Sequence, residues 1–344
     1  MTPIDDFIKR QLDISRDDPP VPQRTPAPSP QLAAYLYSLV VRSEFRRTAL
    51  DQETVSDIHN KIHRQMAGQR PIQFSIPFGA YKNWRLRSSP ELDWAEVFNL
   101  NYLIRYVLPI SVAYNPGVLL QYSYNDHVMD RVSNIPLEHQ RRYVTGFQRL
   151  LSMFQSRLPP NIVLNLVRIN DFYSTDAYAT ELEQNYASTA STWLSKYPSE
   201  VRARKIASAH HNLMLNGVRN LARLPPEELN DEYVRAAMWC DAVDCLKERR
   251  RFNKYADNIQ LVFVRGPTLS LHVGVCDTGS IHFWAGTGIA EVRKDRILQR
   301  ILSRPNLDSL ANTGSLASVC VSSKLATVSA NLQELLLWNN PSLT

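Results

Sequence analysis

Three short apolar runs separated by two long helical patterns constrain the fold of this 344-residue chain more than any other feature. The runs IQFSIPF (72–78), VLLQYSY (118–124) and NIVLNLVRI (161–169) are typical of buried strands. Between them, residues 91–114 and 136–158 place apolar side chains at helical spacing. Such alternation favours parallel strands joined by right-handed crossovers. The sequence therefore predicts an α/β protein with a Rossmann-like, doubly wound core.

The rest of the chain divides by composition. Residues 17–31 are rich in proline, so we expect residues 1–30 to form a mobile N-terminal tail or linker. Long helical patterns predict a helical insertion at about 176–256, inside a single α/β domain of catalytic type that spans 31–304. Residues 305–344 are expected to form a C-terminal extension that packs on this domain.

Alternation of apolar and polar residues resumes at 258–295, around turn signals at 265–267 and 277–279. We predict a late region of antiparallel strands here. A hairpin that turns at 277–279 places His272 and His282 on one face as diagonal neighbours, about 7 Å apart. With no third ligand nearby in the sequence, we expect hydrogen-bonded histidines and no metal site. An acid–base role for one of them stays open.

Composition narrows the classes of partner. The net charge of +6 suits a polyanion or a phosphorylated small molecule, although proteins that bind neither also carry such an excess. The four cysteines contain no CxxC pair, which argues against a zinc ribbon or a disulfide framework. Neither a signal-peptide core nor a run of 18 apolar residues occurs, so we expect a cytoplasmic protein that stays off the membrane. No nucleotide-binding fingerprint is present, and we expect no cofactor.

Polar side chains follow the strand-like runs at their carboxyl ends. In open parallel sheets, ligands bind in the crevice beyond this edge. The residues expected in the crevice are Lys82, Asn125, Asp126, His127, Asn170 and Asp171.

Glu96 lies in the helical segment that follows the Lys82 loop, and it has two interpretations. In the first, Glu96 is a first-turn acid that complements the helix dipole together with Glu91 and Asp93. In the second, Glu96 faces the crevice and pairs with Lys82. The second interpretation leaves three roles open for Lys82: a base, a covalent amine, or an anchor for an anion.

The order of these elements resembles the pyoverdine/dityrosine-biosynthesis family, the isonitrile (isocyanide) synthases. The resemblance is carried by FSIPFGAYKN at 74–83, the acidic helix with Glu96, the second strand with its Asp-containing loop, and LSLH at 269–272. The chain departs from the family pattern at 124–129, which reads Tyr-Asn-Asp-His-Val-Met instead of Ser-Asp-Gly-Arg-Val-Phe. It also has Thr268 where the family has an arginine.

Members of this family condense the amine of an amino acid with the ketone of ribulose 5-phosphate and take one of its carbons as the isonitrile. The resemblance implies that Lys82, Glu96, Asp126 and His272 are catalytic. A reaction that joins an amine to a carbonyl needs groups that move protons, and cations that hold a phosphate or carboxylate. The residues assigned to substrate binding are Tyr81, Asn125, His127, Arg168, Asp171, Arg265 and His282.

The sequence therefore predicts an isonitrile-synthase-like enzyme of specialised metabolism that modifies the amine of an amino acid or a derivative. Its expected partners are that small molecule and a phosphorylated sugar as the carbonyl donor, with nucleic acid disfavoured. Two alternatives stay open. One is a divergent member with a different reaction on the same fold. The other is a non-catalytic module that binds nucleic acid through the basic run KERRRFNK at 247–254, which is otherwise a solvated helix end.

Overall fold

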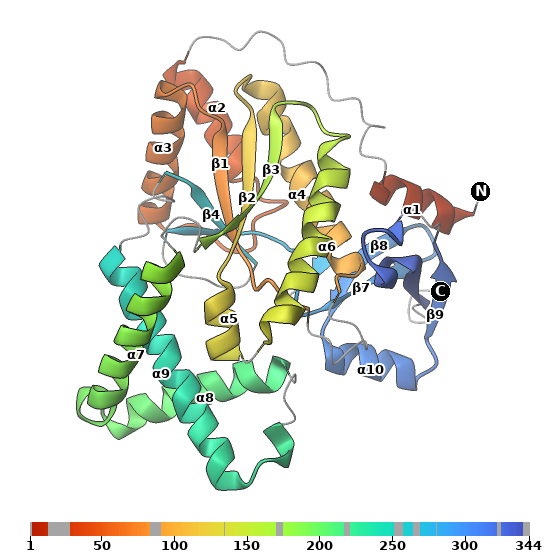
Figure 1. Cartoon of the computed structure of the whole chain (residues 1–344). Coiled ribbons are helices and arrows are strands. Elements are labelled where there is room, and N and C mark those ends of the chain that lie inside the picture. The colour runs from red at the N-terminus through yellow and green to blue at the C-terminus, as the bar shows by residue number, and fades with distance from the viewer. Residues whose placement is uncertain are drawn as a thin grey trace.

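The structure of the chain is a computed structural model, shown in Figure 1. It describes residues 2–12, 28–82, 91–133, 135–169, 175–216, 221–250, 257–263, 269–279, 281–321 and 325–339. The helices are α1 (Pro3–Leu12), α2 (Pro30–Val40), α3 (Gln52–Ala67), α4 (Trp94–Ala113), α5 (Asp126–Ser133), α6 (Leu137–Gln155), α7 (Thr175–Lys196), α8 (Ser199–Asn216), α9 (Pro226–Arg250) and α10 (Arg304–Asn312), with short turns η3 (Leu221–Arg223) and η6 (Ala330–Gln333). The strands are β1 (Ile72–Pro77), β2 (Val118–Tyr124), β3 (Ile162–Arg168), β4 (Ile259–Val262), β5 (Ser270–His272), β6 (Thr278–Gly279), β7 (Thr287–Val292), β8 (Ile297–Leu302), β9 (Leu316–Cys320) and β10 (Glu334–Asn339).

The first sheet is parallel and has the strand order β3-β2-β1-β4-β5 in the described part of the chain. Ile72 of β1 pairs with Val118 of β2, which pairs with Ile162 of β3, so the three predicted strands are in register. Helices α4 and α6 connect them, as the helical patterns predicted. The predicted doubly wound α/β core is therefore confirmed. The strand order reverses between β1 and β4, which is where such sheets bind ligands.

The pairing of β4 and β5 differs from the sequence prediction. Both strands were expected in an antiparallel region, but they pair in parallel with each other, and β4 pairs in parallel with β1. The expected hairpin turn at 277–279 is also wrong, because Thr278–Gly279 forms β6 and pairs with β8. An antiparallel hairpin does occur later, between β7 and β8. Alternation predicts strands, but it does not tell which distant strand each one pairs with.

The second sheet has the order β6-β8-β7-β10-β9 among the described residues. Strand β10, near the C-terminus, inserts between β7 and β9 and runs parallel to β7. This sheet packs on the first turn of α4. There, the Trp94 indole donates a hydrogen bond to the Glu334 carbonyl, and the backbone of Gly288 lies against that of Ala95.

Part of the expected N-terminal tail is folded onto the domain. Helix α1 buries Phe7 and Gln11, and the Phe7 ring meets Phe98 of α4 edge-on at 6.0 Å. The Asn101 amide of α4 donates to the Gln11 backbone carbonyl at 2.6 Å. Helix α1 thus packs on α4 through Phe7 and Gln11, while the mobile tail expected for 1–30 stays a prediction. The other expected domain boundaries stay predictions.

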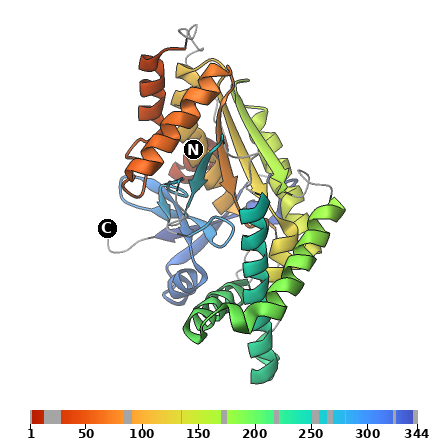
Figure 2. The ribbon, with the colours of Figure 1, turned by 90° about the vertical axis from the view of Figure 1, so that its left-hand side faces the viewer.

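Helices α7, α8 and α9 form a lobe apart from the second sheet, as both views in Figures 1 and 2 show. The lobe has small apolar clusters of its own. In one of them Tyr178, Leu182 and Trp239 join Val132 of α5. The predicted helical insertion therefore packs against α5, the helix that follows β2. None of the helices in the described residues combines the length and apolar character needed to cross a membrane.

Gly288 provides a test of how the two sheets are joined. A Cβ added there would overlap the backbone of Trp94 and Ala95, which cannot move without displacing α4. We expect Gly288→Ala to lower the free energy of unfolding by about 3 kcal/mol. Chemical denaturation measures the effect. The control is Gly68→Ala, whose added Cβ comes nearest to the flexible Arg70 side chain at 3.1 Å and meets the Arg64 carbonyl oxygen at 3.5 Å, an ordinary contact distance. Equal stability of the two variants would contradict this close contact.

Candidate functional site

Lys82 follows β1 on the side of the sheet where the strand order reverses. Its ammonium lies 2.9 and 3.1 Å from the two carboxylate oxygens of Glu96 and 3.1 Å from Oδ1 of Asp93. It also donates to the Phe283 carbonyl at 2.9 Å. The exposed fractions of the Lys82, Asp93 and Glu96 side chains are only 4%, 1% and 0%. The three N–H donors of the lysine are therefore matched by three groups that accept them.

Local sequence explains why two carboxylates meet the lysine. Asp93 is the N-cap of α4 and Glu96 is the third helical residue, and together they form a capping box. Asp93 Oδ1 accepts from the Ala95 amide at 2.8 Å and from the Gly288 amide of β7 at 3.2 Å. From the sequence, we expected Asp93 to be only a first-turn acid. The pattern Asp-x-x-Glu was the signal that could have identified its place beside Lys82.

Tyr143 of α6 is a further member of this cluster, which consists of Lys82, Asp93, Glu96 and Tyr143. Its hydroxyl donates to Glu96 Oε1 at 3.0 Å, and the side chain is fully buried. No sequence signal pointed to it, because a tyrosine at an apolar helical position is indistinguishable from a core residue. Only the packing of α6 beside α4 brings it to Glu96.

Aromatic rings enclose the cluster. Phe78, at the end of β1, packs against Tyr143 at 6.3 Å and Phe283 at 6.0 Å between ring centroids. Phe147 stacks with both Tyr143 and Phe283, at 6.2 and 6.1 Å. These rings exclude water from the charged groups, and an apolar surrounding disfavours the charged form of a carboxyl group.

Burial raises the pKa of Glu96 from 4.5 to about 7. The Lys82 ammonium opposes this rise, and the nearby Asp93 carboxylate reinforces it. The physical reason is a charge imbalance. One cation faces two carboxylates, so ionising both leaves a net negative charge in an apolar site. Glu96 is therefore the carboxyl group of the cluster that gains and loses a proton near neutral pH, as a general acid or base must.

His272 and His282 are not arranged as the sequence predicted. His282 stacks on Trp284 at 4.2 Å between ring centroids, and burial lowers its pKa to about 4, so its imidazole is neutral at pH 7. It is adjacent in sequence to Phe283, whose carbonyl accepts from Lys82. His272 ends β5, and its Nδ1 has no hydrogen-bond partner among the described residues. The predicted hairpin pairing of His272 with His282 is wrong, because β5 belongs to the first sheet.

Arg168 lines a small cavity at the carboxyl ends of β2 and β3. Tyr124 and Arg168 are partners in the sheet register, and both face a cavity of about 270 Å³ against the first turns of α6. Arg141 and Thr145 of α6 also line this cavity, and none of its lining residues is acidic. An oxyanion would therefore meet two guanidinium groups there.

The remaining predicted residues divide into two groups. Asn125 is buried and its amide donates to the Tyr178 hydroxyl at 2.5 Å, while Tyr81 is half-buried against the main core. The side chains of Asp126 and His127, and residues Asn170, Asp171 and Arg265 as a whole, lie outside the described part of the chain. Among the described residues, no group of three His, Cys, Asp or Glu side chains is placed to hold a metal ion.

The raised pKa of Glu96 predicts a pH-dependent stability. Between pH 4.5 and 7 the folded state binds more protons than the unfolded state, so the contribution of Glu96 to the free energy of unfolding falls as pH rises. Glu96→Gln cannot titrate. We expect the free energy of unfolding of the wild type, relative to that of Glu96→Gln, to decrease by up to about 3 kcal/mol as the pH rises through this window. Urea denaturation at several pH values measures the difference, and parallel curves would contradict the prediction.

No family model and no curated protein sequence matches the chain. The solved structure of the PvcA protein from Pseudomonas aeruginosa is similar, with a TM-score of 0.59 and 14% identity over 90% of this chain and 100% of that chain. A CDPS from Fluoribacter dumoffii has a TM-score of 0.31 and 11% identity over 66% of this chain and 85% of that chain, which is too weak to carry an argument. The first likeness confirms the resemblance inferred from the sequence at the level of the fold.

Proposed function

We propose that the chain is an isonitrile-synthase-like enzyme that joins the amine of an amino acid, or of a derivative, to the carbonyl group of a sugar-phosphate-like donor. The observation that carries this proposal is the buried cluster at the switch point of the sheet, where Glu96 has a pKa of about 7 beside Lys82. The fold shared with PvcA supports it.

Glu96 is the acid–base group in this proposal. Its carboxylate takes a proton from the substrate ammonium, and the free amine attacks the carbonyl carbon to form a C–N bond. The protonated Glu96 then gives a proton to the carbonyl oxygen. A group whose pKa lies near the working pH can both accept and donate a proton. A carboxyl group with a pKa of 4.5 stays ionised at that pH and is a poor proton donor.

Lys82 is the cation of the cluster rather than a covalent amine. A Schiff-base lysine must present a free lone pair, whereas the Lys82 nitrogen donates to Glu96, Asp93 and the Phe283 carbonyl. As an ammonium, it opposes the rise in the pKa of Glu96 that burial causes. The same contacts use all three N–H donors, so in this proposal Lys82 holds the two carboxylates of the cluster and does not contact a substrate anion.

Arg168 is proposed to hold the phosphate or carboxylate of a substrate. The cavity that it shares with Arg141 opens at the carboxyl ends of β2 and β3, and a guanidinium group pairs with two oxygens of an oxyanion at once. The proposed anion site lies at the same edge of the sheet as the Lys82 cluster. In this proposal Arg168 orients the substrate, and Glu96 of the Lys82 cluster transfers protons.

The first test is product formation. Purified protein is incubated with the twenty amino acids and ribulose 5-phosphate, and mass spectrometry searches for a product one carbon heavier and two hydrogens lighter than an input amino acid. We expect Glu96→Gln to reduce the rate roughly 100- to 10,000-fold, which is the usual contribution of a positioned acid–base group. Lys82→Met should lose the product as well.

Lys82→Met needs a matched control, because leaving two carboxylates unpaired in an apolar site costs about 3–5 kcal/mol. Lys61→Met also removes a buried lysine from an ion pair, with Asp57 at 2.6 Å, but lies on α3 and away from the cluster. It should keep its activity at a temperature where both variants are folded by circular dichroism. A fully active, folded Glu96→Gln would overturn the proposed role of the cluster.

Arg168→Gln tests the anion site. Losing one charge-assisted contact of about 1.5–3 kcal/mol should raise KM for the anionic substrate about 10- to 100-fold and leave kcat almost unchanged. Steady-state kinetics separate the two constants. A change confined to kcat would contradict a role in holding the substrate.

A further inference from the structure

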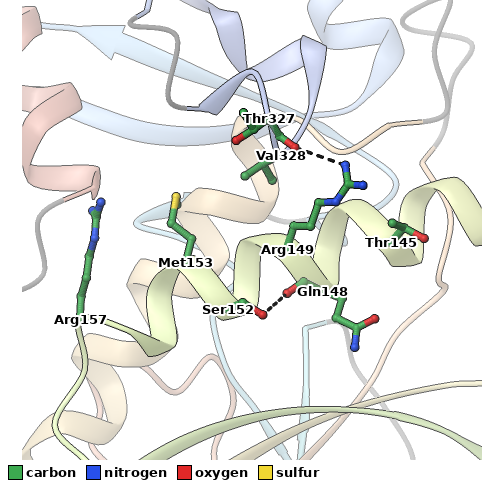
Figure 3. A pocket seen from close by; sticks show the side chains of 8 residues that line it. All are labelled: Thr145, Gln148, Arg149, Ser152, Met153, Arg157, Thr327 and Val328. Carbon is green, nitrogen blue, oxygen red and sulfur yellow. Dashed lines mark hydrogen bonds between the residues drawn. The ribbon is translucent and has the colours of Figure 1, made fainter.

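The segment that leads into β10 lies against α6 and reaches the start of α4. Figure 3 shows Thr327 and Val328 beside α6, at the border of a hollow of about 940 Å³, where the Arg149 side chain donates to the Thr327 carbonyl at 3.3 Å. Gly146 of α6 allows a close approach. A Cβ added to it would lie 3.1 Å from the Leu92 side chain and 3.4 Å from the Val328 carbonyl oxygen. The segment is therefore packed beside the residues that precede α4.

Side chains of this segment hold the backbone just before α4. The Ser329 hydroxyl donates to the Leu92 carbonyl at 2.7 Å. The Asn331 side-chain amide donates to the Glu91 carbonyl at 3.1 Å, and the Asn331 backbone N–H donates to Ser329 Oγ at 3.2 Å. Ser329 is 3% exposed and Leu92 is fully buried. Two successive carbonyl groups before the N-cap are thus bound by residues 237 and 240 positions further along the chain.

One peptide group links Ser329 to Glu96. It joins Leu92 to Asp93, and its carbonyl is the one that accepts from the Ser329 hydroxyl. Its N–H donates to Glu96 Oε2 at 2.8 Å. A peptide group is planar, so the orientation of its carbonyl also fixes the orientation of its N–H. Hydrogen bonds in such a chain polarise one another, so the bond from Ser329 also strengthens the N–H as a donor.

We infer that Ser329 is a positioning residue for Glu96 and that it acts through this peptide group. The inference deepens the proposed function, and its effect on the rate rests on the acid–base role proposed for Glu96. Without the hydroxyl, the buried carbonyl loses a donor. An unpaired carbonyl turns toward other donors and takes the N–H of the same plane with it. The Glu96 carboxylate then loses a hydrogen bond that favours its charged form, so the pKa of Glu96 rises further above 4.5.

The other groups that face Glu96 keep their contacts when this hydroxyl is removed. Lys82 Nζ and the Tyr143 hydroxyl lie 2.9 and 3.0 Å from Glu96 Oε1. The Asp93 carboxylate is held by Lys82 and by two backbone amides. Ser329 itself carries no charge. A change in the pKa of Glu96 therefore reports the orientation of the peptide N–H.

The test is the protonation state of Glu96 in the full chain carrying Ser329→Ala. Infrared spectra of each protein minus those of its Glu96→Gln counterpart show the protonated carboxyl group of Glu96, and a pH series gives the midpoint of its titration. We expect a midpoint of about 7 in the wild type and one at least about half a unit higher in Ser329→Ala. Ser329→Thr keeps the hydroxyl on an extended backbone that suits a β-branched residue, so it should match the wild type.

Ser111→Ala is the matched control. Ser111 is also buried, with 1% exposure, and its hydroxyl donates to the Leu108 carbonyl at 2.8 Å. It lies on α4, about 22 Å further along the helix than Glu96, so the midpoint should stay at the wild-type value. Equal midpoints in the wild type and Ser329→Ala would overturn the inference. So would an equal shift in Ser111→Ala, or a shift in Ser329→Thr as large as that in Ser329→Ala.

This readout separates the positioning role from the proposed reaction, because the titration of Glu96 needs no product. A shifted midpoint in Ser329→Ala, with no product from the wild type, would support the positioning role and count against the proposed function. Product formation with an unshifted midpoint would do the reverse. Where product forms, the pH–rate profile of kcat/KM should move with the infrared midpoint.

Discussion

The burial of one ammonium group between two carboxylates is the constraint on which the rest of the structure depends. Asp93 and Glu96 carry a capping box at the start of α4, and Lys82 neutralises only one negative charge. Removing one partner of a buried pair is far more costly than the pair is stabilising, so the surroundings must hold all three side chains together. Burial, reinforced by the second carboxylate, raises the pKa of Glu96 to about 7.

The same residues join the two sheets of the protein. Asp93 accepts from the amide of Gly288 in β7, while Lys82 donates to the carbonyl of Phe283. Trp94 reaches the carbonyl of Glu334 at the start of β10. The second sheet is thus attached at the start of α4, beside the cluster. A change that loosened this attachment would also alter the proton affinity of Glu96, which couples stability to the proposed chemistry.

The residues of the site that could be predicted are those that a local sequence pattern marks. Lys82 was predicted to be a site residue because it follows a strand. Glu96 was predicted because it lies in the next helix of the same crossover. Asp93 was visible as part of a capping pattern, yet its contact with Lys82 was not inferred. Tyr143 and Phe283 reach the cluster from 47 and 201 residues away in the chain, relative to Glu96 and Lys82, and no local pattern marks such contacts.

The sequence by itself determined the α/β class, the three parallel strands β1 to β3, their connecting helices and the position of Lys82 at a strand end, because periodicity and strand order are local properties. Only the tertiary structure decided that β4 and β5 extend the first sheet in parallel, and that His272 and His282 are not hairpin neighbours. Strand pairing depends on which distant edge is free. The pKa of Glu96 likewise depends on burial, which residue spacing alone does not specify.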